Sequence, residues 1–202
     1  MQATLLAGFR DATLDSQACF RSALRAMSEP GLVCEAKVPL EWPGRCPSAL
    51  TALALTLLDA ETTFSVLGLD DLEGYLRFHT GAQAAPPAEA DYVFTHEDTI
   101  NESLGWLQTL RFGSAEWPET SSTLIVGVGS LHAPGHAKAC TLSLSGPGIE
   151  TTRMFHPEGL PRSFWEWRMA REPDYPLGID LFLCSGSAWA AIPRSTHITW
   201  GD

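Results

Sequence analysis

The segment YPLGIDLFLCSGSAWAAIPRSTHI, residues 175–198, contains two apolar runs on either side of a short polar turn at 185–187. Apolar runs of this length, bounded by turn residues, are typical of buried strands, so the segment predicts a hairpin in the core. Asp180 lies inside the first run, where a buried carboxylate needs a partner, and Arg194 lies on the returning strand. The pattern favours a structural ion pair between the two, with a ligand-binding role as the alternative.

The end of the same segment carries Ser195 and His197, which are the residue types of a nucleophile and its base. Residues two apart on a strand face the same side, so the geometry allows contact. A serine nucleophile also needs an oxyanion hole and usually a sharp exposed turn such as G-x-S-x-G, which this sequence lacks. We therefore interpret residues 193–197 as a structural or contact-making strand end, and we expect no catalytic residue.

The rest of the chain mixes helical and strand patterns. Helical stretches are 13–27, a helix opened by Pro47, 70–79, 100–110 and 160–171. Strand-like stretches are 32–38, 62–67, 92–94, 123–131, 137–145 and 150–155, with 123–131 and 137–145 joined in a hairpin by a tight turn at 133–135. This order predicts a single α/β domain, residues 1–202, with a mixed sheet flanked by helices.

The charge balance restricts the classes of partner. With 13 Lys and Arg residues against 24 Asp and Glu, the formal net charge is −11, and a field of that sign repels nucleic acid and anionic membranes. No apolar run approaches the roughly 18 residues that a membrane span needs, and residues 1–14 lack the basic region of a secretory signal. We therefore expect a cytoplasmic protein whose 5 widely spaced cysteines are reduced and mostly buried.

Two short patterns resemble ligand sites. His132, His136 and Cys140 have a spacing that suits a metal ion, but Pro134-Gly135 predicts a turn between the histidines. The alternative is a pair of solvated turn histidines, and we expect no metal. Gly127-x-Gly129 follows a strand, as in a dinucleotide-binding loop, but the third glycine, the helix and the acidic residue of that motif are missing.

Two further polar residues close the third predicted helix. Arg77 and His79 near a helix C-terminus interact favourably with the helix dipole, so stability alone explains them. An alternative function requires them to share a pocket with Asp180, Arg194 and His197. The chain would then be an independent small-molecule enzyme or a protein that grips a phosphate ligand through arginine.

Five motifs together resemble one known family. In chain order they are AMSEPG at 26–31, LRFHT at 76–80, LSGPGI at 144–149, PLGIDL at 176–181 and AIPRSTH at 191–197. No single motif is specific, but their order and spacing over nearly the whole chain resemble the PhnH family of the bacterial carbon–phosphorus lyase system. Ser195 stands where threonine is expected in the family, a change that keeps the hydroxyl.

The resemblance implies an accessory role in alkylphosphonate catabolism. PhnH-like proteins belong to a core complex with PhnG-, PhnI- and PhnJ-like subunits and form homodimers when alone. The PhnI-like subunit couples a phosphonate to the ribose of ATP and displaces adenine, and it needs its companions to do so. The product is ribose 1-phosphonate 5-triphosphate. Cleavage of the carbon–phosphorus bond belongs to the PhnJ-like subunit, so the resemblance implies a chain that is non-catalytic alone.

The resemblance also implies a fold like the large domain of pyridoxal-phosphate-dependent transferases. That chemistry needs a lysine for the Schiff base, and the chain has only Lys37, on a predicted strand, and Lys138, after a predicted turn. Neither lies in a strand-to-helix setting that indicates a cofactor pocket. The cysteines also lack the clustered pattern of an iron–sulfur site. We therefore expect the fold without a cofactor.

Overall fold

The hairpin predicted within 175–198 is present in the computed structural model of the chain. It consists of β8 (Asp180–Ser185) and β9 (Ala188–Ile192), which pair antiparallel. Gly186 in the connecting turn has a φ of 55°, a left-handed conformation that glycine adopts without steric cost. The structure describes residues 6–36, 38, 40, 46–69, 71–132 and 140–201.

The hairpin belongs to a seven-stranded sheet with the order β1-β9-β8-β5-β4-β2-β3. Its other strands are β1 (Cys34–Glu35), β2 (Thr63–Leu67), β3 (Gln83–Ala84), β4 (Tyr92–His96) and β5 (Thr123–Gly127). In the order of the sheet, the neighbouring strands β3, β2, β4, β5 and β8 run parallel to one another. Strand β9 is antiparallel to both of its neighbours. The predicted α/β fold with a mixed sheet is therefore confirmed.

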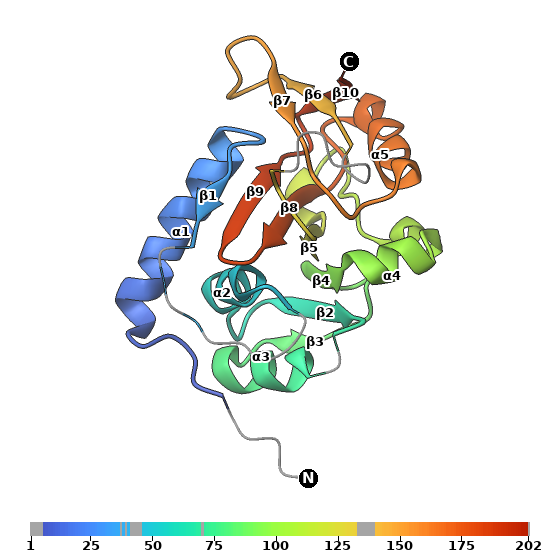
Figure 1. Cartoon of the computed structure of the whole chain (residues 1–202). Coiled ribbons are helices and arrows are strands. Elements are labelled where there is room, and N and C mark those ends of the chain that lie inside the picture. Colours follow the sequence, from blue (N-terminus) through green and yellow to red (C-terminus); the bar gives the residue numbers. More distant parts are fainter. Residues whose placement is uncertain are drawn as a thin grey trace.

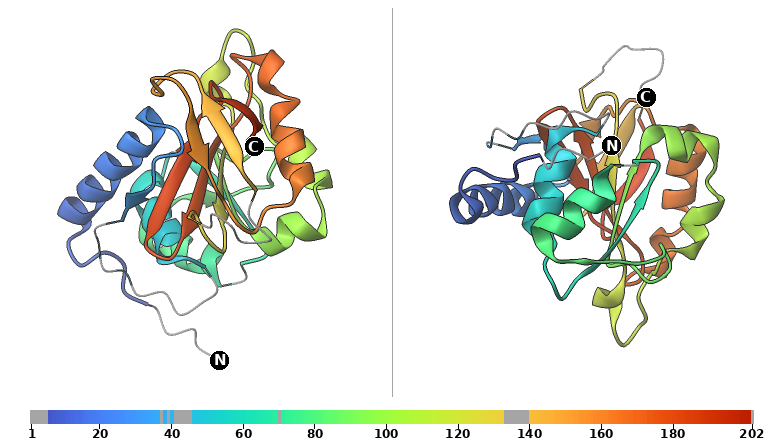
Figure 2. Two further views of the ribbon diagram at one scale, coloured as in Figure 1. Left: turned by 45° about the horizontal axis from the view of Figure 1, so that its top comes forward. Right: turned by 90° about the horizontal axis from the view of Figure 1, so that it is seen from below.

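Helices cover both faces of this sheet (Figures 1 and 2). One face carries α1 (Ala12–Ser28), α2 (Ser48–Leu57) and α3 (Leu72–Thr80), and the other carries α4 (Glu97–Glu102), the 3-10 turn η1 (Gly105–Thr109) and α5 (Arg162–Met169). Two further 3-10 turns are η2 (Pro118–Thr120) and η3 (Glu172–Asp174). Within the described ranges, no helix is long and apolar enough to cross a membrane.

A small antiparallel sheet, with the order β10-β6-β7, packs over the core formed with α4 and α5. Its strands are β6 (Leu142–Ser145), β7 (Arg153–Phe155) and β10 (His197–Trp200). The prediction that 123–131 and 137–145 form one hairpin is therefore wrong, because β5 lies in the large sheet and β6 in the small one. Most of β5 is buried on both faces, which suits a covered sheet, whereas β6 alternates buried and half-buried residues. The turn predicted at 133–135 lies outside the described residues.

Two other predicted elements also differ. The helix expected at 100–110 is broken: α4 ends at Glu102, Ser103 has an extended backbone, and η1 begins at Gly105. Serine and glycine are poor helix formers, so this stretch does not hold a continuous helix. Among the described residues of the strand expected at 32–38, only the two of β1 lie in a strand.

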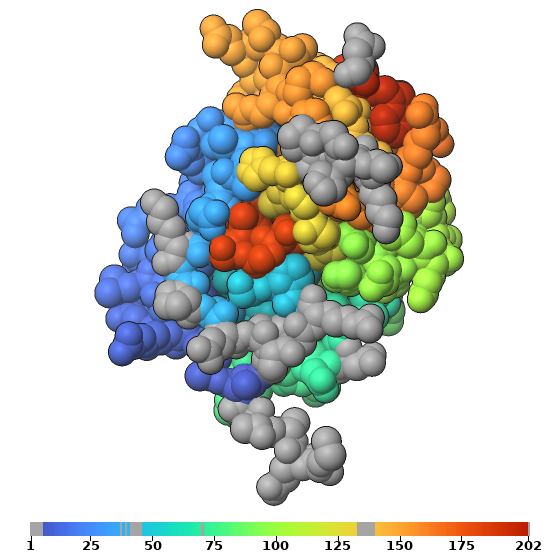
Figure 3. All heavy atoms as spheres, viewed as in Figure 1, coloured from blue at the N-terminus to red at the C-terminus, as the bar shows by residue number. Residues whose placement is uncertain are grey.

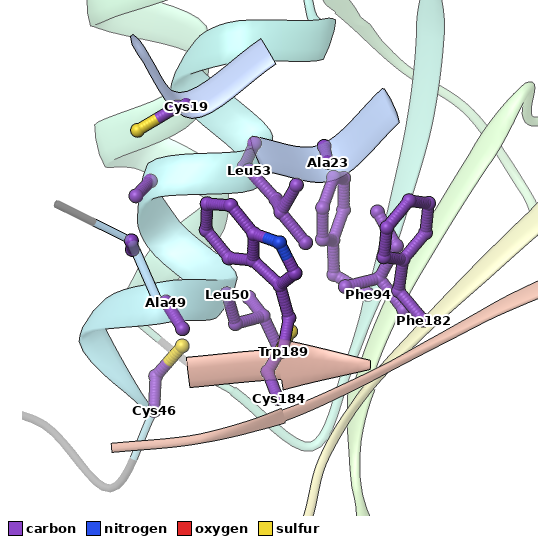
Figure 4. Close-up of a cluster of buried hydrophobic side chains, with 14 of the residues drawn as sticks. Cys19, Ala23, Cys46, Ala49, Leu50, Leu53, Phe94, Phe182, Cys184 and Trp189 are labelled. Atoms are coloured by element: carbon purple, nitrogen blue, oxygen red, sulfur yellow. The ribbon is translucent and has the colours of Figure 1, made fainter. Parts of the chain in front are cut away.

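The core beneath α1 and α2 is organised around Trp189 of β9. Figure 4 shows its indole beside Ala23 of α1 and Leu50 and Leu53 of α2. Trp189 and both leucines are completely buried. The indole N–H has no hydrogen-bond partner, so Trp189 acts here by filling space.

Asp91 holds the amino ends of β2 and β4 together. Its carboxylate accepts hydrogen bonds from the backbone N–H of Thr63 at 2.8 Å and from the Thr63 hydroxyl at 2.7 Å, and it pairs with Arg111. Burial alone would raise the pKa of Asp91, but these donors outweigh burial and hold the pKa below its usual value. The charged carboxylate therefore stabilises the folded state.

We expect Asp91→Asn to make the free energy of unfolding depend less on pH in the acidic range. Because the pKa of Asp91 is lower in the folded state, its contribution is complete above the unfolded-state pKa of about 3.9 and is lost as the pH falls further. Urea unfolding between about pH 7 and pH 3 should show a smaller loss of stability for Asp91→Asn than for the wild type. Glu116→Gln, at an exposed position, is the control and should follow the wild-type curve.

We expect Trp189→Ala to destabilise the fold by about 3–5 kcal/mol, because it leaves a large cavity in a close-packed core. Denaturant unfolding at neutral pH measures this loss. Trp117→Ala is the matched control, since Trp117 is 61% exposed and its loss should change stability by less than about 0.5 kcal/mol. Equal effects of the two substitutions would contradict the packing role of Trp189.

Candidate functional site

The predicted ion pair between Asp180 and Arg194 is present at the amino end of β8. Arg194 Nη2 donates to Asp180 Oδ2 at 2.7 Å, and Arg194 Nε and backbone N–H donate to Oδ1 at 3.3 and 2.9 Å. Arg194 Nη1 also donates to the carbonyl of Pro118 in η2 at 2.6 Å. The side chains are 17% and 19% exposed, so the pair is largely desolvated and joins β8, the chain after β9, and η2.

Ser195 and His197 are not arranged as a nucleophile and its base. Residues 193–196 form a turn closed by the Thr196 N–H and the Pro193 carbonyl at 3.0 Å, and β10 begins only at His197. The His197 ring is 61% exposed, and its Nδ1 contacts Glu172 of η3. No hydrogen bond between Ser195 and His197 occurs in the described part of the chain. The segment is therefore a turn between two sheets rather than the strand end that we predicted.

A buried arginine that the sequence analysis did not single out lies beneath this turn. Arg168 of α5 is 3% exposed, and its Nη2 donates to the Pro193 carbonyl at 2.9 Å. Burial lowers the pKa of Arg168, and the carboxylates of Glu172 and Asp180 oppose that shift. The available signal was helical spacing, because Phe164, Trp165 and Arg168 are three and four residues apart on the buried side of α5.

Together these residues form a group that we call the turn cluster: Arg168, Glu172, Asp180, Arg194 and His197. Glu172 accepts from the Ile198 N–H at 2.8 Å as well as contacting His197. Both carboxylates are thus already bonded to donors from the protein itself. The cluster fastens α5, β8 and β10 to one another.

The opposite edge of the sheet, at the carboxyl ends of the parallel strands, is where α/β proteins usually bind ligands. After β2 the chain turns to α3 on one face, and after β4 it turns to α4 on the other. His96 ends β4, with its Nδ1 3.2 Å from Asp98 Oδ2, and Glu97 accepts a hydrogen bond from the Gly129 N–H at 2.6 Å. The Gly-x-Gly pattern therefore forms no open phosphate loop, because this amide is occupied. In the sequence, the polar residues His96, Glu97 and Asp98 directly after the buried strand β4 could have indicated this edge as a candidate site.

Arg77 and His79 lie elsewhere, at the C-terminal end of α3. This helix packs against β2 and β3, and β2 is three strands away from β8. Arg77 is exposed and approaches Glu73 at 3.8 Å, while His79 Nε2 lies 3.0 Å from the Leu6 carbonyl. The structure thus pairs Asp180 with Arg194 and places His197 on Glu172, and it brings neither Arg77 nor His79 to them.

The metal candidates are only partly within the described ranges. His132 forms a single bridge with His156, and the Cys140 N–H donates to the Pro157 carbonyl at 3.2 Å. His136 lies outside the described residues, as do Lys37 and Lys138. Among the described residues, no group of three His, Cys, Asp or Glu side chains could hold a metal ion.

The cysteines are free thiols, and four of the five are buried, as predicted. Burial raises the pKa of Cys19 and of Cys46 to about 11. Thiols with such values are poor nucleophiles at neutral pH. These side chains therefore serve as small apolar groups of the core.

We expect Arg194→Met to lower stability by about 2–4 kcal/mol, because it leaves Asp180 largely buried without its guanidinium partner. Asp180→Asn and the double variant complete a double-mutant cycle, with a coupling energy above about 1 kcal/mol. Arg77→Met removes an arginine that is 63% exposed and should cost less than about 1 kcal/mol. A coupling energy near zero would show that the two side chains act independently.

Comparison with known proteins agrees with the motifs. Residues 7–199 match the family model described as bacterial phosphonate metabolism protein (PhnH). HtxG of Stutzerimonas stutzeri, a protein named as a C-P lyase subunit, is 32% identical over 186 residues, which cover 90% of this chain and 85% of HtxG. The PhnH subunit of alpha-D-ribose 1-methylphosphonate 5-triphosphate synthase from Rhizobium meliloti (strain 1021) is 28% identical over 194 residues, which cover 94% of this chain and 93% of that protein. The chain therefore belongs to the PhnH family of bacterial phosphonate metabolism proteins.

Proposed function

We propose that this chain is an accessory subunit of a ribose 1-methylphosphonate 5-triphosphate synthase within the carbon–phosphorus lyase core complex. It supports the formation of ribose 1-phosphonate 5-triphosphate from ATP and phosphonate and catalyses no step alone. The match of residues 7–199 to the PhnH family carries the proposal. The relative from Rhizobium meliloti, which is similar over 94% of this chain, is itself named as a synthase subunit.

The charges of the turn cluster support a role without chemistry of its own. Asp180 is held by Arg194, and Glu172 is held by His197 and a backbone N–H. Donors of the protein itself thus engage both carboxylates, which fits groups that hold the turn in place. We propose that the cluster, together with Ser195 in its turn, keeps the surface between the two sheets in shape for contact.

The proposed partners are PhnG-, PhnI- and PhnJ-like subunits, and we propose a homodimer for the isolated chain. We further propose one cytoplasmic domain whose fold is like the large domain of pyridoxal-phosphate-dependent transferases but holds no cofactor. A largely parallel sheet covered by helices on both faces supports the fold likeness. The net charge of −11 supports partners other than nucleic acid and membranes.

The alternative of an independent phosphate-binding enzyme gains no support from the arrangement of its residues. It needs Arg77 and His79 in one pocket with Asp180 and Arg194. Arg77 and His79 belong to α3, which packs at the β2–β3 edge of the sheet, while the ion pair lies at β8.

We expect the tagged chain to bring PhnG-, PhnI- and PhnJ-like subunits with it in a fixed ratio. The experiment is affinity purification from the native host grown on methylphosphonate as the sole phosphorus source, followed by mass spectrometry. Light scattering of the isolated chain measures the proposed dimer. Purification of the chain alone, while the companions are shown to be expressed, would refute the subunit role.

A further inference from the structure

Helix α1 carries large apolar side chains on two sides. Its inner side is buried in the core, but Leu14, Phe20 and Leu24 on the outer side are 62%, 51% and 57% exposed. At about 100° per residue these three side chains fall within an arc of about 120°. Polar side chains such as Gln17 and Arg21 lie among them, and Figures 1 and 3 show α1 along one rim of the molecule. The outer side of α1 is therefore an unpartnered surface of a kind that marks a contact site.

Two grooves flank this outer side. The larger, of about 440 Å³, lies between α1 and residues 32–35, and Arg21 and Arg25 form part of its wall. The smaller, of about 290 Å³, lies between α1 and Thr56 at the end of α2, beside Phe20. Arg21 lines both grooves. A partner laid across α1 thus meets Arg21 between two hollows, with Phe20 in the smaller one.

The floor of the larger groove is the outer edge of the large sheet. As far as the chain is described, strand β1 ends that sheet and pairs with β9 alone. The Ser22 hydroxyl donates to the Glu35 carbonyl at 2.9 Å, so α1 already satisfies part of this edge. An occupant therefore gains little from adding a strand here, and it is recognised through its side chains.

The lining of the larger groove carries two arginines, Arg21 and Arg25, against one carboxylate, Glu35, which accepts a hydrogen bond from the Ser187 hydroxyl at 2.9 Å. Within the described residues Arg21 forms no ion pair, and Arg25 pairs with Glu29 at 3.1 Å in an exposed position. Burial raises the pKa of Cys34 at the groove, while the charges of Arg25 and Arg153 act to lower it and that of Glu29 to raise it. Exposed arginines beside an exposed aromatic ring are typical of interface anchors.

We propose that the outer face of α1, with the groove over β1, docks an acidic segment of a companion subunit that also carries apolar side chains. The inference rests on the proposed function and adds the surface and the chemistry of the partner. A second copy fits this face poorly. A two-fold contact centred on Phe20 brings the Arg21 side chains of both copies together, and like charges oppose association. The proposed homodimer then uses another face.

The chain offers a matched pair of sites for the test. Phe20-Arg21 on α1 and Arg77-Phe78 on α3 are both an exposed phenylalanine beside an exposed arginine, with Phe78 65% exposed. The double variants Phe20→Ser/Arg21→Glu and Phe78→Ser/Arg77→Glu are each co-expressed with the PhnG-, PhnI- and PhnJ-like subunits. Affinity purification then measures the companions recovered per tagged chain. We expect the α1 variant to recover at least about tenfold fewer companion subunits than the wild type. The α3 variant should recover as many as the wild type, and both variants should be as stable to unfolding as the wild type.

A second comparison tests the acidic character of the occupant. Arg21→Lys keeps the charge and Arg21→Gln removes it. Recovery of the companion subunits should therefore be highest for the wild type, lower for Arg21→Lys and lowest for Arg21→Gln. The difference between the two variants should shrink in high salt. Equal recovery for the two variants would refute an acidic occupant.

The outcomes separate this inference from the subunit role. If the wild type recovers its companions and the α1 variant recovers as many, the docking face is wrong while the proposed function stands. If the wild type recovers none, the proposed function fails first. If the α1 variant is monomeric in light scattering but retains its companions, the occupant is a second copy. If the α3 variant loses companions equally, the effect is not specific to α1. Each of the last two results overturns the proposal.

Discussion

Strands β5 and β8 are apolar on both faces, and the need to cover both faces organises the rest of this protein. Leu124 and Leu181 enter the core beside α4 and α5, while their neighbours Ile125 and Phe182 enter the core beneath α1–α3. Removing such surface from water stabilises the fold by about 25 cal/mol per Å². One set of helices cannot cover both faces. The chain therefore places α1–α3 on one side and α4, α5 and the small sheet on the other.

The positions of the charged groups follow from this arrangement. With both faces of the sheet covered, ionic groups collect at the ends of the strands, where hydrogen-bond partners are available. Asp91 and Asp180 both lie at the amino ends of parallel strands, and each is bonded to an arginine. Arg168 is buried because α5 has to place Phe164 and Trp165 in the core, and a residue three positions on faces the same way. Its contact with the Pro193 carbonyl joins α5 to the turn between the sheets.

Some large apolar side chains stay exposed even though both faces of the sheet are covered. The inner side of α1 is sufficient to close its core, yet the outer side carries Leu14, Phe20 and Leu24 at more than half exposure. In an isolated chain such a surface is costly in solubility, whereas in a subunit it is a contact. Membership of the PhnH family and the exposed apolar side chains of α1 are thus two independent observations that favour a role as a subunit of a complex.

The sequence by itself determined the features that depend on near neighbours. The β8–β9 hairpin follows from two apolar runs around Gly186, and the Asp180–Arg194 pair follows from the hairpin register, because both ends of the hairpin lie side by side. The family follows from five motifs in order. Only the tertiary structure decided that β5 and β6 belong to different sheets, since pairing between distant segments depends on which faces remain to be covered. It also decided that His197 meets Glu172 rather than Ser195, because the turn at 193–196 carries the chain from one sheet to the other before β10 begins.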